Sequence, residues 1–395
     1  MKKHISLFLI FAIIIVSCIS LKSCDDEDVV FATPAEPMPF NDITAVEWVA
    51  NVKIGWNLGN TLDAHDGKSS GSANQLETMW GVPVTKSSNF TTLKNAGFNA
   101  IRIPVTWYKV TDKNYNIRDS WMKRVVEVVN YAVENDMYII LNTHHDEDIF
   151  KFTDAQVNES LYAFQKVWQQ IAEVFRNYDE KLVFEGLNEP RNKSNPQQWN
   201  GGSLEERNNL NTHYQVFVDT VRASGGNNDK RVLMVNTYAA SAGQTAVDGL
   251  VLPNDPVPNK IIVSIHAYEP YNFALNNRSP INTWSADNPA DISNIVNNFN
   301  RAHDKFVSKG IPVVMGEFGA MNKNNEATRA LWAEFYVKTA MDKGIPCIWW
   351  DNGAFSGSGE LFGLLNRNTN TFAYPLVVAG LMKGVEGWSA PAAAE

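Results

Sequence analysis

The stretch Leu-Val-Phe-Glu-Gly-Leu-Asn-Glu-Pro, residues 182–190, carries the pattern that decides the fold. It begins as an apolar run and ends in Asn-Glu-Pro, which places Glu189 directly after the run. A continuous apolar run is typical of a parallel strand that is buried on both faces. A second run, residues 312–315, ends in the same way with Gly-Glu-Phe-Gly and contributes Glu317. Both glutamates are therefore expected at the ends of buried strands.

Runs of this kind recur along the chain and alternate with segments of helical periodicity. Strands are expected near 52–58, 100–105, 138–143, 182–187, 232–237, 261–267, 313–316 and 347–351. Helices are expected near 89–95, 121–131, 161–175, 204–223, 292–307, 327–342 and 376–382. The crossover between residues 237 and 261 has the weakest helical pattern, because it is rich in Pro, Asn and Gly.

This alternation predicts the fold class. Strands that alternate with helices form a parallel sheet with right-handed crossovers. Eight such units in one domain predict an α/β fold, a single (β/α)8 TIM barrel over residues 43–388. The active site of such a barrel lies at the C-terminal ends of its strands. A doubly wound open sheet is the alternative, but it does not predict chemical residues at all eight strand ends.

Polar and aromatic residues do stand at the ends of the expected strands. Because a buried polar group costs stability unless it is paired, this placement indicates a site. The candidates are Asn60, Arg102, His144, His145, Asn188, Glu189, His266, Tyr268, Glu317 and Trp350. Two carboxyl groups at strand ends are the minimum equipment for cleaving a glycosidic bond by acid/nucleophile chemistry.

The other residue types suit the same chemistry. Arg102 can hold a nearby glutamate ionised by charge pairing. His144, His266 and Tyr268 can supply hydrogen bonds to that network and to sugar hydroxyls. The amide of Asn188 can reach the 2-hydroxyl of the reacting sugar.

Aromatic rings provide the expected sugar platforms. The indole of Trp350 can lie under the reacting sugar, although its neighbour Trp349, on the opposite face of the strand, remains the alternative. His145 is expected to support the substrate subsites or the fold, and Asn60 to line the substrate site. Three tryptophans in strand-to-helix loops are either further platforms or packing residues: Trp80, Trp107 and Trp284.

Taken together, eight motifs resemble glycoside hydrolase family 5, the retaining cellulase family of the (β/α)8 clan. They are GWNLGNTLDA (55–64), ETMWG (77–81), GFNAIRIPVTW (97–107), HHD (144–146), FEGLNEPR (184–191), HAYEPY (266–271), GEFGA (316–320) and WWDNG (349–353). They cover the chain from about 43 to 385 and look most like subfamily 4, known for endo-glucanases and xyloglucanases.

The resemblance implies a function and roles for the two glutamates. Glu189 would be the acid/base and Glu317 the nucleophile of a double displacement that retains the anomeric configuration. The substrate would be a β-1,4-glucan such as cellulose, mixed-linkage glucan or xyloglucan. A mannanase or xylanase on the same scaffold is the alternative, because specificity resides in contacts grafted on the fold. A non-catalytic glycan-binding surface lipoprotein would predict a replaced glutamate, yet both are present.

Neither a cofactor nor a metal is expected. Adjacent histidines at a strand end, as in His144-His145, point apart and do not have a recognised zinc spacing. The formal charge of −9, from 43 acidic and 34 basic residues, predicts poor nucleic-acid binding. The expected partner is therefore a β-glucan polysaccharide, bound by a monomer.

The first residues indicate export. Lys2 and Lys3 precede an apolar run at 5–16, and together they form the basic and hydrophobic regions of a secretory signal. The run is short for a membrane span. An outer-membrane surface lipoprotein, or otherwise a secreted protein, is the expected location.

The cysteines refine this prediction. Cys24 is followed by the acidic run 25–28, which resembles the lipoprotein signal of the Bacteroidetes group. Residues 1–23 are thus expected to be the signal peptide, and Cys24 the lipidated residue that anchors the chain to a membrane. Lipidation at Cys18, or an ordinary cleaved signal without lipid, is the alternative. Cys347 lies in an apolar run and is expected to be a core residue.

Two further segments are expected to lie outside the barrel. Residues 24–42 combine the four-residue acidic run 25–28 with three prolines and show no amphipathic pattern, which predicts a tether. Residues 389–395 are expected to form a flexible tail.

Overall fold

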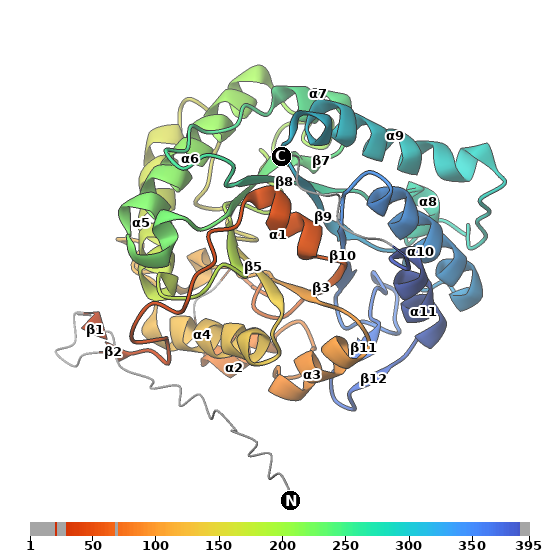
Figure 1. Ribbon diagram of the computed structural model, residues 1–395, viewed down its shortest axis with the longest axis horizontal. Helices are drawn as coiled ribbons and strands as arrows, with labels where there is room; N and C mark the ends of the chain where they lie inside the picture. The colour runs from red at the N-terminus through yellow and green to blue at the C-terminus, as the bar shows by residue number, and fades with distance from the viewer. Residues whose placement is uncertain (1–19, 22–28, 68–69, 388–395) are drawn as a thin grey trace, which may run out of the picture.

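Parallel strands close into a barrel in the computed structural model, which describes residues 20–21, 29–67 and 70–387. Neighbouring strands follow one another in the chain, and the last pairs with the first. They are β3 (Ile54–Leu58), β4 (Ala100–Ile103), β5 (Tyr138–Asn142), β6 (Leu182–Glu185), β7 (Leu233–Ser241), β8 (Ile261–His266), β9 (Val313–Phe318) and β10 (Cys347–Asp351). Figure 1 shows the barrel end-on inside its ring of helices. The predicted (β/α)8 barrel is confirmed, and closure excludes the open sheet.

Helices cover the outside of the barrel. They are α3 (Ser87–Asn95), α4 (Asp119–Glu134), α5 (Val157–Phe175), α6 (Leu204–Ala223), α7 (Gln244–Gly249), α9 (Pro289–Lys305), α10 (Glu326–Met341) and α11 (Pro375–Gly384). The crossover with the weakest helical pattern holds only the six residues of α7. Shorter elements are α2 (Ala73–Glu77), α8 (Tyr271–Ala274), η1 (Tyr108–Val110), η2 (Gly226–Asp229), η3 (Val307–Lys309), and the strand pairs β1 (Ser20–Leu21) with β2 (Val29–Val30) and β11 (Leu365–Asn366) with β12 (Thr371–Phe372).

One helix at the N-terminal end of the barrel was not predicted. Helix α1 (Ala45–Asn51) begins at a capping box in which Thr44 and Glu47 satisfy each other's backbone N–H groups. It ends at Asn51, and its C-cap is Val52, which the sequence had assigned to the first strand. The helix buries Trp48 completely, in a cluster with Ile140, Val183 and other residues of the barrel interior. The helix therefore closes the barrel at this end.

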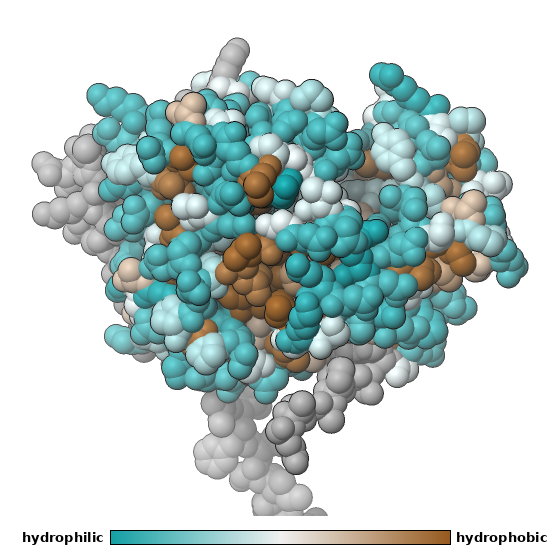
Figure 2. Space-filling view, turned by 90° about the horizontal axis from the view of Figure 1, so that it is seen from above, coloured by the Kyte–Doolittle hydropathy of each residue, from teal (hydrophilic) through white to brown (hydrophobic). Residues whose placement is uncertain are grey.

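Two layers of apolar side chains hold the barrel together. The strands are buried on both faces, with a small cluster inside the barrel and a large one between strands and helices. Cys347 belongs to the large cluster, where burial raises the pKa of its thiol, so the predicted core role is confirmed. The side of the molecule in Figure 2 is largely hydrophilic, with apolar residues gathered in a central patch.

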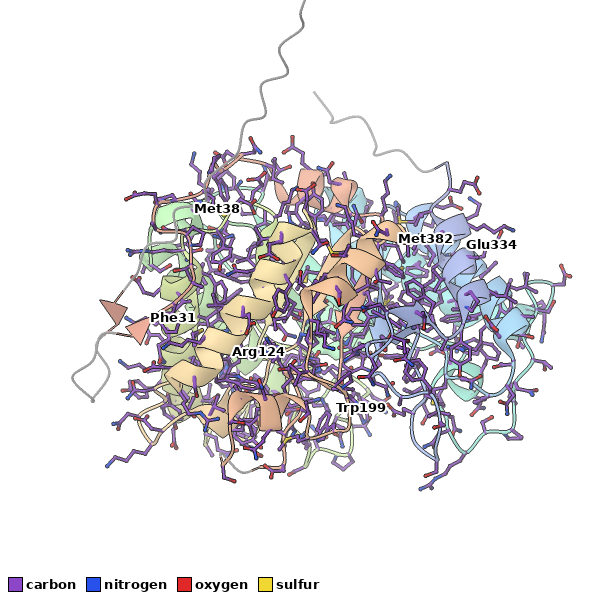
Figure 3. The ribbon with its side chains drawn as sticks, turned by 90° about the horizontal axis from the view of Figure 1, so that it is seen from below. Phe31, Met38, Arg124, Trp199, Glu334 and Met382 are labelled. Carbon is purple, nitrogen blue, oxygen red and sulfur yellow. The ribbon has the colours of Figure 1, made fainter. Side chains whose placement is uncertain are left out.

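Part of the expected tether is packed against the barrel. Phe31 is 2% exposed, and the side chain of Asn177 donates to the carbonyl oxygens of Pro34 and Ala35 at 2.9 and 3.1 Å. The side chain of Asn41 donates to Glu180 at 2.7 Å. Polar side chains of the barrel thus form hydrogen bonds with backbone groups of this segment, which are not paired within a helix or strand. Figure 3 shows Phe31 and Met38 on this strap, which runs from Phe31 to residue 42.

Several predictions for the two ends of the chain fall outside the described residues. They are most of the signal peptide, lipidation at Cys24 or Cys18, and the tail at 389–395. Within the described part, no helix combines the length and apolar character that crossing a bilayer requires.

Candidate active site

A fully buried arginine organises the C-terminal end of the barrel. The Arg102 side chain on β4 donates from Nε to Glu185 at 2.7 Å and from Nη1 to Glu317 at 2.7 Å. It also donates to the side-chain oxygens of Asn57 at 2.9 Å and Asn188 at 2.8 Å. One rigid guanidinium thus connects strands β3, β4, β6 and β9.

The charges around Arg102 explain its place in the core. Burial opposes its positive charge, but the carboxylates of Glu185 and Glu317 raise its pKa above the usual value. Glu185 is itself fully buried and also accepts from the amides of Asn142 and Asn236 at 3.1 and 2.9 Å. Glu185 is thus paired inside the barrel, which leaves Glu317 as the carboxylate nearer the surface.

The two predicted catalytic glutamates face each other across His266. The Nδ1 atom of His266 lies 3.2 Å from Oε1 of Glu189 and 3.7 Å from Oε2 of Glu317. One carboxylate oxygen of each glutamate and one ring nitrogen of His266 all lie within 4.8 Å of one another. The hydroxyl of Tyr268 donates to Oε2 of Glu317 at 2.9 Å. The structure therefore brings four of the predicted residues together.

Their environments differ in charge. Burial would raise the pKa of Glu189, but the hydrogen bond from His266 and the charges of His266 and Arg191 bring it below its usual value. Burial, together with the two glutamates, raises the pKa of Tyr268 well above its usual value. Tyr268 is therefore a neutral donor to Glu317, and the charge of Glu189 depends on its cationic neighbours.

An aromatic surface borders the carboxyl groups, and it decides between the two tryptophans of β10. Trp350 is 8% exposed and its ring is parallel to that of His144, with 5.7 Å between centroids. Trp349 is fully buried and donates from Nε1 to the carbonyl of Phe362 at 3.1 Å. Because only Trp350 adjoins the site, it is the better candidate for the floor.

His145 belongs to a second aromatic group beside the first. Its ring lies 4.4 Å from that of His144, 5.4 Å from that of His65 and 5.7 Å from that of Trp80. Burial lowers the pKa of His144 well below its usual value and that of His145 to about 3, so both rings are neutral near pH 7. They can accept or donate hydrogen bonds but do not carry charge.

The remaining predicted residues have clear places. Asn60 is partly exposed at a φ of 57°, and its backbone N–H donates to Asp63 at 3.0 Å. Trp80 is 39% exposed and is still a candidate platform. Trp107 and Trp284 are buried at 0% and 7% exposure and serve packing.

Some site residues were given no individual role from the sequence. Asn57, Asn142 and Asn236 bind the Arg102–Glu185 pair, and each is an asparagine inside an apolar strand. That isolated polar residue was the available signal. Arg191, whose Nη1 lies 3.5 Å from Oε2 of Glu189, had no comparable signal because it follows the strand in a polar loop.

Among the residues that the structure describes, two groups of side chains have ligand atoms close enough together for a metal ion. One is the site itself, Glu189, His266 and Glu317, and the other is Asp63, His144 and His145. The two carboxylate oxygens of Asp63 already accept backbone N–H groups at 3.0 and 2.6 Å. Asp63 is thus satisfied without an ion, and the absence of a metal stays a prediction.

A buried arginine, an aromatic floor and two facing carboxyl groups at the end of a (β/α)8 barrel define the class of the protein as a glycoside hydrolase. The sequence places it within that class. The model of the family described as Cellulase (glycosyl hydrolase family 5) matches residues 63–356, so the chain belongs to glycosyl hydrolase family 5.

Known relatives agree along most of the chain. It is 45% identical over 349 residues to Endoglucanase B of Neocallimastix patriciarum, covering 87% of this chain and 72% of the relative. It is similar to the structure of a GH5-4 broad specificity endoglucanase from Ruminococcus champanellensis with bound cellotriose, at 47% identity and a TM-score of 0.85, covering 88% of this chain and 100% of that one. A family 5 lichenase from Caldicellulosiruptor in complex with cellotetraose is 42% identical with a TM-score of 0.83, covering 89% and 98%.

Proposed function

We propose that this chain is a retaining endo-β-1,4-glucanase that hydrolyses internal linkages of β-glucans. The observation that carries the mechanism is the spacing of the two glutamates, whose oxygens lie within 4.8 Å of each other and of His266. Carboxyl groups about 5 Å apart suit a covalent intermediate, whereas a wider gap would hold the attacking water of an inverting enzyme.

Glu317 is the nucleophile in this proposal. Its carboxylate receives hydrogen bonds from Arg102 and Tyr268, which fix its orientation. It attacks the anomeric carbon, and the bond from that carbon to the leaving oxygen breaks. The result is a glycosyl ester on Glu317 with inverted configuration at the anomeric carbon.

Glu189 is the acid/base. In the first step its carboxylic acid gives a proton to the leaving oxygen, and the freed sugar chain departs. In the second step its carboxylate takes a proton from water, which attacks the ester and restores the original configuration. In the free site, His266 and Arg191 lower the pKa of Glu189 and so favour its ionised form. The acid form that the first step needs is therefore lost as the pH rises.

The neighbouring side chains position the sugar. The amide oxygen of Asn188 accepts from Arg102 at 2.8 Å, which leaves its NH2 group to bind a hydroxyl near Glu317. Trp350, stacked on His144, offers an apolar face to the reacting ring. These contacts support a neutral sugar substrate, and no charged group of the ligand is required.

The names of the relatives support β-glucans as the substrate class. Among them are endoglucanases, a lichenase, and a structure with bound cellotriose. Xyloglucan belongs to the same proposal, because its backbone has the same linkage. We further propose that the chain is exported and anchored through a lipid on Cys24, which mass analysis of the mature N-terminus would test.

Product profiling tests the function. Carboxymethyl cellulose, mixed-linkage glucan, xyloglucan, glucomannan and xylan are digested, and the products are followed over time. Early release of mid-length oligosaccharides from the glucans is expected. A preference for mannan or xylan would indicate the alternative specificity, and no release by the folded protein would overturn the proposed activity. Product configuration, followed by NMR, should be that of the substrate.

A further inference from the structure

Three buried polar atoms on neighbouring strands have no hydrogen-bond partner among the described residues. They are Oδ1 of Asn236 on β7, and Oγ of Ser264 and Nε2 of His266 on β8. Their residues are buried, with exposed fractions of 0%, 0% and 6%. Asn236 and Ser264 are register partners in the parallel sheet, so their side chains leave it on the same face. Because an unpaired buried polar group is costly, this cluster indicates a binding site.

The glycine before the nucleophile keeps two of these atoms close together. A Cβ atom on Gly316 of β9 would stand 2.5 Å from Oγ of Ser264 and 3.0 Å from Nε2 of His266. The two atoms are therefore no more than 5.5 Å apart, which is the sum of these distances. One water that forms two hydrogen bonds of about 2.8 Å spans such a gap. Buried waters typically bind about three polar groups that the protein leaves unpaired, and Asn236 on the next strand offers a third.

A second buried histidine shows how this chain satisfies a neutral imidazole. Nε2 of His213, on α6, lies 2.7 Å from Oγ of Ser160, and its Nδ1 lies 2.8 Å from the carbonyl oxygen of Asn209. Because a carbonyl oxygen only accepts, Nδ1 of His213 carries the proton and Nε2 accepts from the serine hydroxyl. Burial lowers the pKa of His213 to about 4, so this ring is neutral near pH 7. A serine hydroxyl on one side and an oxygen acceptor on the other thus fix the tautomer.

We propose that a buried water joins the hydroxyl of Ser264 to Nε2 of His266, and that Ser264 thereby directs the proton of His266 toward Glu189. The inference rests on the proposed glucanase function, in which Glu189 is the acid/base. Nε2 accepts from the water, so the proton stays on Nδ1, which lies 3.2 Å from Oε1 of Glu189. His266 then donates to a carboxylate oxygen, as His213 donates to the carbonyl oxygen of Asn209. Ser264 is therefore a positioning residue that acts through His266.

The effect on the acid/base passes through one hydrogen bond. The hydrogen bond from His266 lowers the pKa of Glu189. Loss of the partner at Nε2 weakens the preference for a proton on Nδ1, so the pKa of Glu189 should rise. The titratable groups around Glu189 all stay in place when Ser264 is replaced: His145, Arg191, His266, Tyr268, Glu317 and Glu360. A shift of the pH profile in a Ser264 variant therefore reports on His266.

Kinetics of Ser264→Ala on cellopentaose test the positioning role. The kcat should fall roughly two- to ten-fold, the effect of losing one hydrogen bond, while KM stays the same because Ser264 faces the barrel interior. The alkaline limb of kcat/KM should move up by roughly half a pH unit. Ser264→Thr keeps the hydroxyl and should restore most of the activity and the original profile.

The other buried serine–histidine pair provides the matched control. Ser160→Ala removes a hydroxyl between α5 and α6, where Nε2 of His213 and the backbone N–H of Lys151 lose their partner. The stability of this variant should fall, because buried groups are left unpaired. Its kcat and its pH profile should match those of the wild type, because the pair is not part of the active site.

Two direct measurements detect the water and the tautomer. A high-resolution crystal structure should show density for one water within hydrogen-bond distance of Oγ of Ser264 and Nε2 of His266. NMR of protein with isotope-labelled histidine reports which ring nitrogen carries the proton, and a His266→Asn variant assigns the signals. His266 should carry its proton on Nδ1, like His213, and Ser264→Ala should raise the share of the other tautomer.

The outcomes separate the parts of the proposal. A crystal structure with no water between the two side chains, or with the hydroxyl of Ser264 directly on Nε2, would overturn the water site. A proton on Nε2 of His266 in the wild type, or an unchanged pH profile in Ser264→Ala, would overturn the positioning role. Inactivity of the wild-type protein on β-glucans would instead reject the glucanase function, and the crystal structure and NMR would still decide on the water and the tautomer.

Discussion

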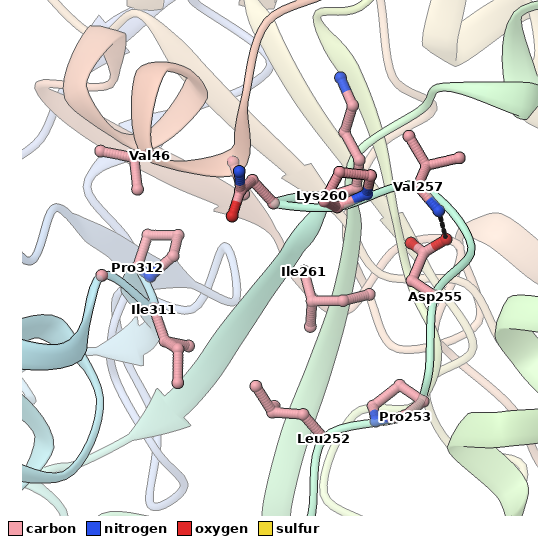
Figure 4. Close-up of a pocket in the computed structure, with 13 residues that line it drawn as sticks. Val46, Leu252, Pro253, Asp255, Val257, Lys260, Ile261, Ile311 and Pro312 are labelled. Atoms are coloured by element: carbon pink, nitrogen blue, oxygen red, sulfur yellow. Dashed lines mark hydrogen bonds between the residues drawn. The ribbon is translucent and has the colours of Figure 1, made fainter. Parts of the chain in front are cut away.

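The two ends of the barrel are built from the same strands but hold different kinds of side chain. At the N-terminal end a cavity of about 230 Å³ is lined largely by apolar and proline residues, among them Val46, Leu252, Ile311 and Pro312 (Figure 4). At the C-terminal end the buried side chains include Arg102 and two facing glutamates. The contrast shows that an empty volume alone does not identify the active site.

Hydrogen bonding separates the two ends further. Lys260, a buried cation at the N-terminal end, is satisfied by Asp42 and the carbonyl of Ile43. At the other end, Nε2 of His266 is buried without a partner among the described residues. An unpartnered buried group costs about 1–3 kcal/mol, which a site can recover when a ligand provides the missing bond. The C-terminal end thus keeps a buried hydrogen-bonding group that a ligand can use, whereas the amine of Lys260 at the N-terminal end already has its partners.

The largest expected effect comes from removing the nucleophile at the C-terminal end of the barrel. Glu317→Ala should lower kcat on β-glucans by roughly 10⁴-fold or more, because no covalent intermediate can form. Azide should restore part of the turnover and give a product of inverted configuration. Glu180→Gln, at the buried carboxyl that holds Asn41 near the other end, is the control and should keep its activity. Azide rescue in a Glu189→Ala variant instead would exchange the two roles.

The next effect compares the buried cations of the two ends. Arg102→Met should destabilise the protein by about 3–5 kcal/mol, because Glu185 is left buried without its charged partner. Lys260→Met should cost only about 1 kcal/mol, since its partner Asp42 is half exposed and also pairs with Lys230. Urea unfolding of both variants measures the difference. Equal costs would show that the Arg102 network does not hold the C-terminal end together.

A smaller effect concerns the acid/base. The hydrogen bond from His266 and the charge of Arg191 lower the pKa of Glu189, so Arg191→Gln should raise that pKa. A raised pKa keeps the acid form to higher pH, and the alkaline limb of kcat/KM should move up by roughly half a pH unit. Profiles on cellopentaose between pH 4 and 9 would show it. A shift to lower pH would contradict the assignment of that limb to Glu189.

The smallest effect is expected at the N-terminal cavity. Val46 is 45% exposed beside it, and Val46→Ser should change the free energy of unfolding by no more than about 0.5 kcal/mol. The kcat/KM on glucans should stay the same. Reduced activity with unchanged stability would mean that the two ends of the barrel are coupled, which the contacts do not predict.

Much of the site could be predicted because the barrel gives chain position a spatial meaning. Apolar runs identified the strands, and a polar residue at the end of each run had to reach the same end of a parallel barrel. Helix α1 and the packed strap were not predicted from the sequence. Short or irregular segments are held by partners far along the chain, and no local pattern indicates those partners. The strap depends on Asn177 and Glu180, more than a hundred residues away.

The amino-acid sequence by itself determined the eight-fold alternation, the family and the two glutamates, because each is written in local patterns and motifs. Only the tertiary structure decided which of Trp349 and Trp350 borders the site, how Arg102 divides its hydrogen bonds, and that Gly316 on β9 adjoins Ser264 on β8. Those contacts join residues from different strands and loops, and their geometry exists only once the barrel has closed.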